Sequence, residues 1–458
     1  MNTGSPVRPE ARRPLWNEAA VIIRLDARDS KHMLKKLKSR SQRTFKFALA
    51  GVCLLVLIGT RGDAMRLDVV QEIAAPYSYD IITWHLENFL SKWTHRVFRA
   101  IPGNGISSED RLARVEEYFA LGVDASKLKS EIDRIAVNAS DPGESGVVDV
   151  ESELKELRAR KRKLRADVEE AIEAGISEVA RAAGLGVVGE FVFPPVDIRL
   201  TEPPKVLVTS PRDRIERSLE VLVDPHVDVG DREAMESRLL ESEDLAAIVL
   251  DIGGVATYPA SLYDGGNLRG TLRTAAHEWL HHYFFFGPLG QNMFKSPEMQ
   301  VLNETAADLA GRELGGLAYR FLGGALNAGE QGIAAVSASP TKPPEPSKDE
   351  FDFDSEMRET RRQTDLLLTQ GRIVDAEVYM ERQRLRFVAN GHPIRKINQA
   401  YFAFNGTYAE SPGSASPIGG QLREFRERMA GVGEFVEKIR GVSSYEEFLS
   451  MLDEGSNG

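Results

Sequence analysis

The stretch His277-Glu278-Trp279-Leu280-His281 carries two imidazoles and one carboxylate within a single helical turn. Residues four apart lie on the same face of a helix, so His277 and His281 can bind one metal ion together. Glu278 lies one residue further round the helix and can reach a water molecule held by that ion. Because the chain has 8 His among its 458 residues, a pattern this short needs support from a second part of the sequence.

A second cluster supplies that support. The segment Asn303-Glu304-Thr305-Ala306-Ala307-Asp308 lies in an Ala- and Leu-rich helical stretch. A catalytic zinc site takes three protein ligands and leaves a fourth position for water. Glu304 is therefore the expected third ligand, and Asp308, on the same helix face, is the expected acceptor for the outer N–H of a ligand histidine. A solvated helix face is the alternative interpretation of these two carboxylates.

These residues resemble the HExxH…NExxxD signature of the gluzincin metallopeptidases, the thermolysin-like class. The resemblance covers about residues 250–315. It implies a zinc cofactor and a hydrolytic activity on peptide bonds. His282 has no place in the signature, and we expect it to pack locally. The roles that the resemblance implies are zinc ligands for His277, His281 and Glu304, general base for Glu278, and orientation of a ligand for Asp308.

The segment before the motif predicts strands. Residues 246–259 are apolar and β-branched, then glycine-rich, and end at a proline, which is typical of one or two strands with a close backbone approach. Thermolysin-like enzymes place an edge strand beside the ligand helix, and the substrate pairs with it as an added strand. The resemblance thus makes Gly254, Val255 and Ala256 the expected substrate-binding residues. A core strand followed by a turn is the alternative.

One further donor is needed for the oxyanion that develops in such a reaction. Gluzincins often use a Tyr or a His supplied from farther along the chain. Here the aromatic-rich segment 397–409 is the candidate. We favour Tyr408 over Tyr401 and His392, because Tyr408 follows a glycine that can bring the backbone close. Buried core aromatics explain the segment equally well. The sequence lacks the Gly-Ala-Met-Glu-Asn motif of related aminopeptidases, which favours an endopeptidase.

The charge of the chain is unevenly distributed. The net charge is −11, but residues 1–46 contain 12 Lys/Arg against 4 Asp/Glu, or +8, which leaves −19 for the remainder. A basic arm on an acidic body suggests a nucleic-acid contact. An uncharged apolar run follows directly at residues 47–60, however. We therefore predict no nucleic-acid partner and interpret the arm as a topology signal or a contact with anionic lipid.

The apolar run predicts a single transmembrane anchor. As a helix it spans about 20 Å, short of the roughly 30 Å hydrocarbon core, but Lys46 and Arg61 can extend toward the interfaces. With the basic arm in the cytoplasm the positive-inside rule is satisfied. The prediction is a single-pass protein of the cell membrane with its catalytic domain outside the cytoplasm. A cleaved signal peptide and a buried helix of a soluble protein are the alternatives.

The cysteine content limits the cross-links and metal sites that the chain can form. The only cysteine, Cys53, lies within the apolar run. An intramolecular disulfide and a cysteine-based metal site are therefore excluded, in agreement with a His/His/Glu zinc site.

Residues 61–182 are predicted to form a helical stalk. From Val150 to Arg181 the chain is charge-dense, with apolar residues at spacings of three, four and seven. This periodicity is typical of a coiled coil or a helical hairpin. Lys161 falls on the apolar seam and the repeat is short, so a hairpin with residues 108–136 and a homodimer through the stalk both fit the pattern.

The rest of the chain completes an α+β fold. Short strand-like segments before the motif suit a small mixed sheet, so we expect a zincin-like metallopeptidase domain over residues 183–327. A proline-rich linker follows at residues 328–350. Residues 351–458 are predicted to form a mainly helical C-terminal lobe, with the substrate cleft between this lobe and the metallopeptidase domain.

The predicted function is that of a membrane-anchored zinc peptidase acting on peptide or protein substrates. One alternative is a non-catalytic, membrane-anchored helical scaffold whose metal staples two helices. Structural zinc sites usually fill all four positions with Cys or His, and Glu278 would then have no purpose. The other alternative is a zinc hydrolase of a non-peptide amide or ester. Water activation is common to both hydrolases, so the motif does not separate them.

Overall fold

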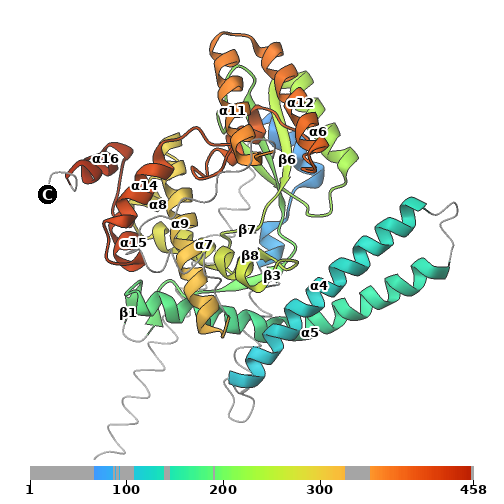
Figure 1. Cartoon of the computed structure of the whole chain (residues 1–458), viewed down its shortest axis with the longest axis vertical. Coiled ribbons are helices and arrows are strands. Elements are labelled where there is room, and N and C mark those ends of the chain that lie inside the picture. The colour runs from blue at the N-terminus through green and yellow to red at the C-terminus, as the bar shows by residue number, and fades with distance from the viewer. Residues whose placement is uncertain are drawn as a thin grey trace, which may run out of the picture. The chain divides into compact units, whose positions relative to one another are not determined.

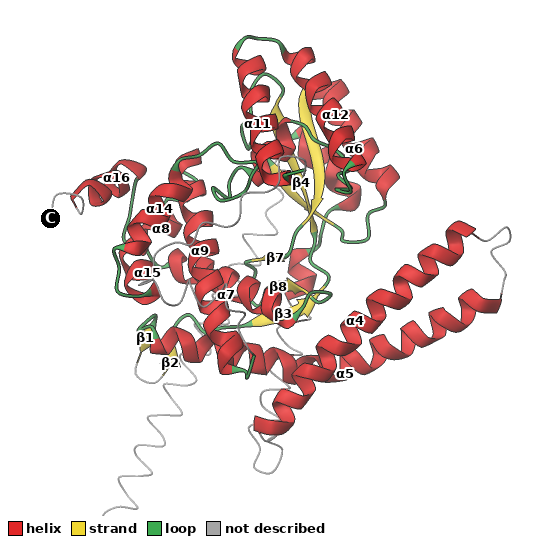
Figure 2. Cartoon of the chain, viewed as in Figure 1, coloured by secondary structure: helices red, strands yellow, loops and turns green. Residues whose placement is uncertain are grey.

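The computed structural model describes residues 67–85, 88, 92, 108–138, 145–188, 191–324 and 351–454. This part of the chain is mixed α/β and mostly helical, as Figure 2 shows. The predicted basic arm, the membrane anchor and the proline-rich linker lie outside the described residues. Among the described helices, none has the length and apolar character needed to cross a membrane.

An antiparallel sheet forms the centre of one lobe, labelled β4, β6 and α6 in Figures 1 and 2. Its central strand β4 (Lys205–Pro211) pairs with β5 (Glu220–Val223) on one side and with β6 (Leu245–Asp251) on the other. Side chains alternate between the two faces of a strand. Leu207 accordingly packs into one buried cluster, and Val206 and Val208 pack into another on the opposite face.

Helices from distant parts of the sequence cover both faces of this sheet. One face is covered by a helix from far upstream and by a helix that lies between two of the strands, and the other face by helices from beyond the predicted linker. On the first face lie α2 (Val69–Ala74) and α6 (Val229–Glu243). On the second face lies α13 (Gln399–Asn405), with α11 (Phe353–Thr369) and α12 (Ile373–Ala389) packed beside it.

A smaller mixed sheet belongs to the second lobe. Strand β8 (Ala260–Tyr263) is central, parallel to β3 (Ile198–Thr201) and antiparallel to the edge strand β7 (Gly254–Val255). The outer edge of β3 is closed by two buried carboxylates of one helix. Glu173 accepts the backbone N–H of Ile198 at 2.9 Å, and Glu169 accepts that of Leu200 at 2.8 Å.

The helix that supplies these carboxylates, α5 (Ser145–Ala182), forms a hairpin with α4 (Ser108–Asn138) that projects from the second lobe in Figure 1. The C-terminal half of α5 packs into the main core through Val168, Ile172 and Ile176. The boundary expected at residue 182 is therefore not a boundary in packing, because the supposed stalk runs directly into the core. Lys161, on the apolar seam, places its ammonium 4.7 Å from the centre of the Tyr118 ring.

Two long helices complete the core of the second lobe. They are α7 (Leu268–Phe285), which carries the HExxH residues, and α9 (Pro297–Phe321), joined through the short α8 (Pro288–Gln291). A β1–β2 hairpin, Val187–Val188 paired with Phe191–Val192, precedes β3. The last helices pack on α9 through Phe425, Phe435 and Phe448. These helices are α14 (Ile418–Glu427), α15 (Val432–Arg440) and α16 (Tyr445–Glu454).

The region after the predicted linker thus does not form a lobe of its own. Helices α11–α13 join the antiparallel sheet, whereas α14–α16 join α9. The sequence suggests a single C-terminal lobe because all these segments are helical. Which apolar face meets which partner is decided by shape, and periodicity alone does not show it.

A buried ionic cluster fastens the two sides of the antiparallel sheet. The carboxylate of Glu236 on α6, 2% exposed, accepts the backbone N–H of Val249 on β6 at 2.7 Å. It is also paired with Arg395 and Lys396, which precede α13. Burial raises the pKa of Glu236, but the hydrogen bonds from Arg395 and Lys396 outweigh burial, so the pKa lies below its ordinary value of 4.5.

Replacing Glu236 by Gln is expected to lower the free energy of unfolding at pH 7 by about 2 kcal/mol, since it leaves two cations without their buried partner. Because the folded pKa is depressed, the stability that Glu236 contributes is present above pH 4.5 and is lost as the pH falls through the folded pKa. Urea unfolding at pH 7 and below pH 4 should show the wild type and variant converging at the lower pH. The exposed Glu233→Gln on the same helix is the control and should match the wild type at both pH values.

Candidate metal centre

The backbones of α7 and α9 approach closely along a seam of two glycines. A Cβ atom on Gly315 would lie 2.7 Å from the Cα of Arg273, and one on Gly311 would lie 3.1 Å from the Cα of His277. Side chains of ordinary size at these positions would push the helices apart. The seam therefore sets the distance between the helix that carries the histidines and the helix that carries Glu304.

Three donor atoms converge at this seam. The Nε2 atoms of His277 and His281 are 3.0 Å apart, and Oε2 of Glu304 lies 3.5 Å from each of them. Ligands bound to zinc at 2.0–2.1 Å in a tetrahedron are separated by about 3.3 Å. Oε2 of Glu304 is buried and has no hydrogen-bond partner. The chemistry and spacing of these donors fit a tetrahedral metal ion.

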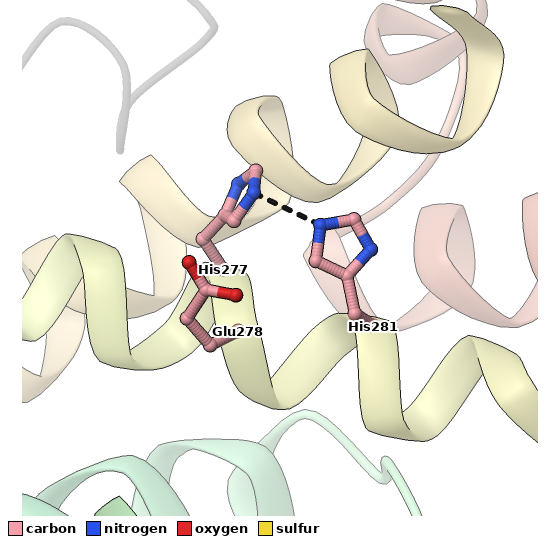
Figure 3. A group of neighbouring side chains, drawn as sticks. All are labelled: His277, Glu278 and His281. Carbon is pink, nitrogen blue, oxygen red and sulfur yellow. Dashed lines mark hydrogen bonds between the residues drawn. The ribbon is translucent and has the colours of Figure 1, made fainter. Parts of the chain in front are cut away.

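Glu278 lies beside the three donor atoms of His277, His281 and Glu304 and is not one of them. Figure 3 shows the two imidazoles facing each other across one turn of α7, with the Glu278 carboxylate beside them. The ligand atoms of His277, Glu278 and His281 all lie within 4.8 Å of one another. Glu278 is nevertheless packed against β7, since a Cβ on Gly254 would lie 2.6 Å from its Oε1. Glu304, equidistant from both rings, is the better third ligand, and Glu278 is placed to act on a bound water.

The electrostatics of the cluster separate the two carboxylates. Burial raises the pKa of Glu278. Burial also raises the pKa of Glu304, but the positive charges of the nearby His281 and His277 reverse this and hold that pKa well below its ordinary value. Burial lowers the pKa of His281, but the nearby Glu304 carboxylate has the larger effect and raises the pKa of His281 to about 9. Glu304 therefore stays anionic, as a metal ligand must, and metal binding would displace the proton of the His281 imidazole.

The outer nitrogen of His281 is held by Asn303, the first residue of the second cluster, for which the sequence predicted no role of its own. Oδ1 of Asn303 lies 2.9 Å from Nδ1 of His281, which orients the ring so that Nε2 faces Glu304. Asp308 was expected in this role. Its carboxylate is instead paired with Arg312, one turn further along α9, and Arg312 also reaches Glu410 at 2.6 Å. Asp308 borders the site, but Arg312, four residues further along the same helix, competes with the histidines for its carboxylate.

Tyr408 enters the site from the loop after α13. Its ring centre is 6.3 Å from that of His277. Thr305, next to Glu304, fixes this loop, because its Oγ1 accepts the backbone N–H of Ala409 at 3.0 Å. Burial, together with the nearby Glu304 and Glu278, raises the pKa of Tyr408 well above its ordinary value. The phenol therefore keeps its proton and can donate a hydrogen bond.

The two other candidates for this role lie elsewhere. Tyr401 packs in the core of the first lobe, against the antiparallel sheet. His392 packs beside Phe353, with the two rings tilted and their centres 4.6 Å apart. Neither residue lines the cleft that holds the three donors.

One cleft of about 1140 Å³ contains the residues favoured for the site from the sequence, whereas the rejected candidates Tyr401 and His392 lie outside it. Its walls come from the antiparallel sheet, from β7, from α7 and α9, and from the loop that carries Tyr408. The sequence-predicted residues in its lining are Gly254, Val255, Ala256, His277, Glu278, His281, Glu304, Asp308 and Tyr408.

Strand β7 presents an open edge to this cleft. It pairs only with β8 among the described strands. Alternate residues of an antiparallel strand direct their backbone groups toward the partner and away from it. The carbonyl of Gly253 accepts the N–H of Tyr263 at 2.9 Å, so the backbone groups of Gly254 point away from β8. They are available to an extended chain lying in the cleft.

His282 packs at the far end of β7. Both of its ring nitrogens are buried and lack a hydrogen-bond partner. Its ring lies 5.4 Å from that of Tyr258. Burial lowers the pKa of His282, so the ring is held neutral. It is a packing residue of the cleft wall and not a fourth donor.

No protein-family model, curated protein or solved structure matches this chain. The resemblance to the gluzincins therefore rests on the residues of the cleft alone.

The roles of Asn303 and Thr305 and the packing of the two glycines were not predicted from the sequence. The Gly311-Arg-Glu-Leu-Gly315 spacing puts both glycines on one helix face, which is a visible signal of close helix packing. Asn303 and Thr305 flank Glu304 directly, but nothing in the pattern tells which side chains they contact.

The seam predicts different effects for two adjacent glycines. Gly315→Ala should lower the free energy of unfolding by about 1–3 kcal/mol through overpacking and weaken zinc binding, because it displaces α9 from α7. Gly316→Ala is the matched control, since no atom lies within 4 Å of the added Cβ. It should stabilise the helix by up to about 1 kcal/mol without changing zinc affinity. Thermal unfolding and competition with a zinc chelator measure both effects. Equal zinc affinities in the two variants would contradict the role of the seam.

Proposed function

We propose that this protein is a zinc-dependent peptidase of the gluzincin kind. His277, His281 and Glu304 would hold the metal, Glu278 would act as general base, and Tyr408 as hydrogen-bond donor to the developing oxyanion. The single observation that supports this most strongly is the position of Glu304 Oε2, which lies 3.5 Å from Nε2 of both histidines although 23 residues or more separate them in sequence.

Zinc suits this donor set. Two imidazoles and a carboxylate are the ligands of catalytic zinc sites that keep one position open. When bound there, zinc lowers the pKa of a water molecule toward neutrality and polarises a carbonyl oxygen. The same donor set also occurs with iron(II). The buried Glu278 beside the site favours hydrolysis, because a general base is what water attack requires.

The side chains of the protein provide the proton transfers. Glu278, with its raised pKa, accepts a proton from the attacking water and passes it to the leaving nitrogen. Tyr408 keeps its phenolic proton and donates a hydrogen bond to the oxygen on which negative charge develops. Because Gly254 has no side chain, β7 lies directly against the Glu278 carboxylate. The scissile bond of a chain paired with β7 would therefore lie beside the base.

The open edge of β7 favours a polypeptide over a small amide or ester. A strand edge in the wall of a cleft offers backbone hydrogen bonds that only an extended chain can use. The volume of the cleft, about 1140 Å³, exceeds what a small amide needs. Because the sequence lacks the Gly-Ala-Met-Glu-Asn motif with which related aminopeptidases hold a free amino terminus, we favour cleavage within chains.

The setting of the activity is proposed from the sequence alone. The apolar run at residues 47–60 and the basic arm before it support a single-pass protein of the cell membrane with the cleft outside the cytoplasm. The α4–α5 pair packs as a hairpin within one chain. A homodimer through the helical stalk, also proposed from the sequence, would therefore use surfaces of the hairpin other than the one where α4 and α5 pack on each other.

The decisive experiment compares the purified full chain with two variants. Glu278→Gln should lower the rate of casein hydrolysis by about 10²–10⁴-fold while the zinc content stays near one per chain, because the residue is not a ligand. Glu304→Ala should lose both zinc and activity. Elemental analysis for zinc and iron, with mass spectrometry of the casein fragments, gives both readouts. Full activity in Glu278→Gln, or undiminished zinc in Glu304→Ala, would refute the proposed mechanism.

Tyr408→Phe tests the oxyanion donor. It should lower kcat by about 10²–10³-fold with little change in KM, since the phenol acts on charge that appears only in the transition state. Zinc content should be unchanged. Tyr401→Phe is the control, because Tyr401 is partly buried in the first lobe and does not line the cleft, and it should retain the wild-type kcat. A wild-type kcat in Tyr408→Phe would remove this residue from the mechanism.

A further inference from the structure

An exposed aromatic surface adjoins the metal centre. We define this aromatic shelf by five residues that line the same cleft, Phe193, Tyr258, Phe285, Phe286 and Phe294. Their exposed fractions are 47%, 39%, 65%, 47% and 84% respectively. Soluble domains rarely leave so many large aromatic side chains together in water without a ligand or a partner.

The shelf is a defined structure. Phe286 lies at the centre, with its ring 5.0 Å from that of Phe193 and 5.3 Å from that of Phe285. Behind it, Arg440 donates a hydrogen bond to the carbonyl of Phe286 at 2.8 Å. The five side chains themselves carry no charge. The surface is thus suited to apolar side chains.

The position of the shelf relative to β7 follows from the contacts of α7. Thr274 and Glu278 lie against Gly254, whereas His282, one turn further along α7, lies against Tyr258. Helix α7 and strand β7 therefore run in the same direction. The shelf, formed by the C-terminal end of α7 and its neighbours, lies beyond the C-terminal end of β7.

An extended chain on β7 reaches this surface. Phe285 is one helical turn beyond His281, which is about 6 Å along the helix axis and equals about two residues of extended chain. Antiparallel pairing is the more stable arrangement of two strands. A substrate antiparallel to β7 would carry its amino-terminal side over the C-terminal end of β7, which is where the shelf lies.

We propose that the aromatic shelf binds an apolar stretch of the polypeptide substrate on the amino-terminal side of the scissile bond, beginning about two residues from it. This inference rests on the proposed peptidase function and specifies its substrate class as extended chains with exposed Phe, Leu, Ile or Val residues. Such stretches are accessible in unfolded or partly unfolded proteins, where they are not yet buried.

Binding to an inactive protein tests the shelf without requiring turnover. The full chain with Glu278→Gln is titrated into two fluorescein-labelled peptides of equal length, one Phe/Leu-rich in its amino-terminal half and one composed of Gly, Ser and Thr. Fluorescence anisotropy should give at least about tenfold tighter binding of the apolar peptide. Adding Phe285→Ser and Phe294→Ser should abolish this preference and leave binding of the polar peptide unchanged.

The matched control is Phe321→Ser in the same background. Phe321 is 56% exposed, at the end of α9, and does not line the cleft. It should retain the preference for the apolar peptide. Equal binding of both peptides, or an equal loss in control and shelf variants, would overturn the proposal. A wild-type dimer that becomes monomeric with the shelf substitutions, seen by analytical ultracentrifugation, would instead make the shelf an interface between copies.

The direction of binding is tested by cleavage sites. Fragments of casein produced by the wild type should show apolar residues enriched two to four positions before the cleaved bond. Enrichment only after the bond would refute antiparallel pairing. Absence of cleavage would refute the peptidase function and leave the anisotropy result as an independent test of the shelf.

Discussion

The structure of the site depends on the near-contact of two helix backbones. Along the Gly311–Gly315 seam, α9 lies against α7 with no room for a Cβ atom at Gly315. This distance determines whether the carboxylate of Glu304 reaches the two imidazoles. It also places Asn303 on His281 and, through Thr305, the loop that carries Tyr408. A single packing constraint therefore positions a ligand, the support of a second ligand, and a donor from a distant part of the chain.

The same arrangement explains why the cleft draws on so much of the sequence. Its floor is formed by α7 and α9, whereas its opposite wall comes from the antiparallel sheet and from the loop after α13. Helices α11–α13 stabilise that wall by covering the sheet, and α14–α16 stabilise the floor by packing on α9. The two groups of C-terminal helices thus hold the two sides of one cleft.

Local patterns in the sequence predict part of this architecture. The i,i+4 spacing of His277 and His281 places both on one face of α7, because helical geometry alone decides that. The convergence with Glu304 is a long-range event that no local pattern shows. It was predicted from the need for a third metal ligand and from the resemblance. Asp308 does not take its predicted role of orienting a ligand histidine, because Arg312, one helical turn away, pairs with its carboxylate. Strand β8 and the division of the C-terminal helices were not predicted, since both depend on which surfaces meet in the folded chain.

The two edges of the small mixed sheet differ in whether their outward backbone groups already have hydrogen-bond partners. Along β3, the carboxylates of Glu169 and Glu173 occupy the backbone N–H groups that another strand would need. Along β7, the corresponding groups face the cleft. An open strand edge invites uncontrolled association between molecules. Here the sheet can be extended on one side only, and that side is recessed between two lobes, so only a slender, unfolded chain can add to it. A folded partner would have to enter the cleft to pair with β7. The recess thus limits which chains can extend the sheet, and protects the edge from the side-by-side association to which exposed strands are prone.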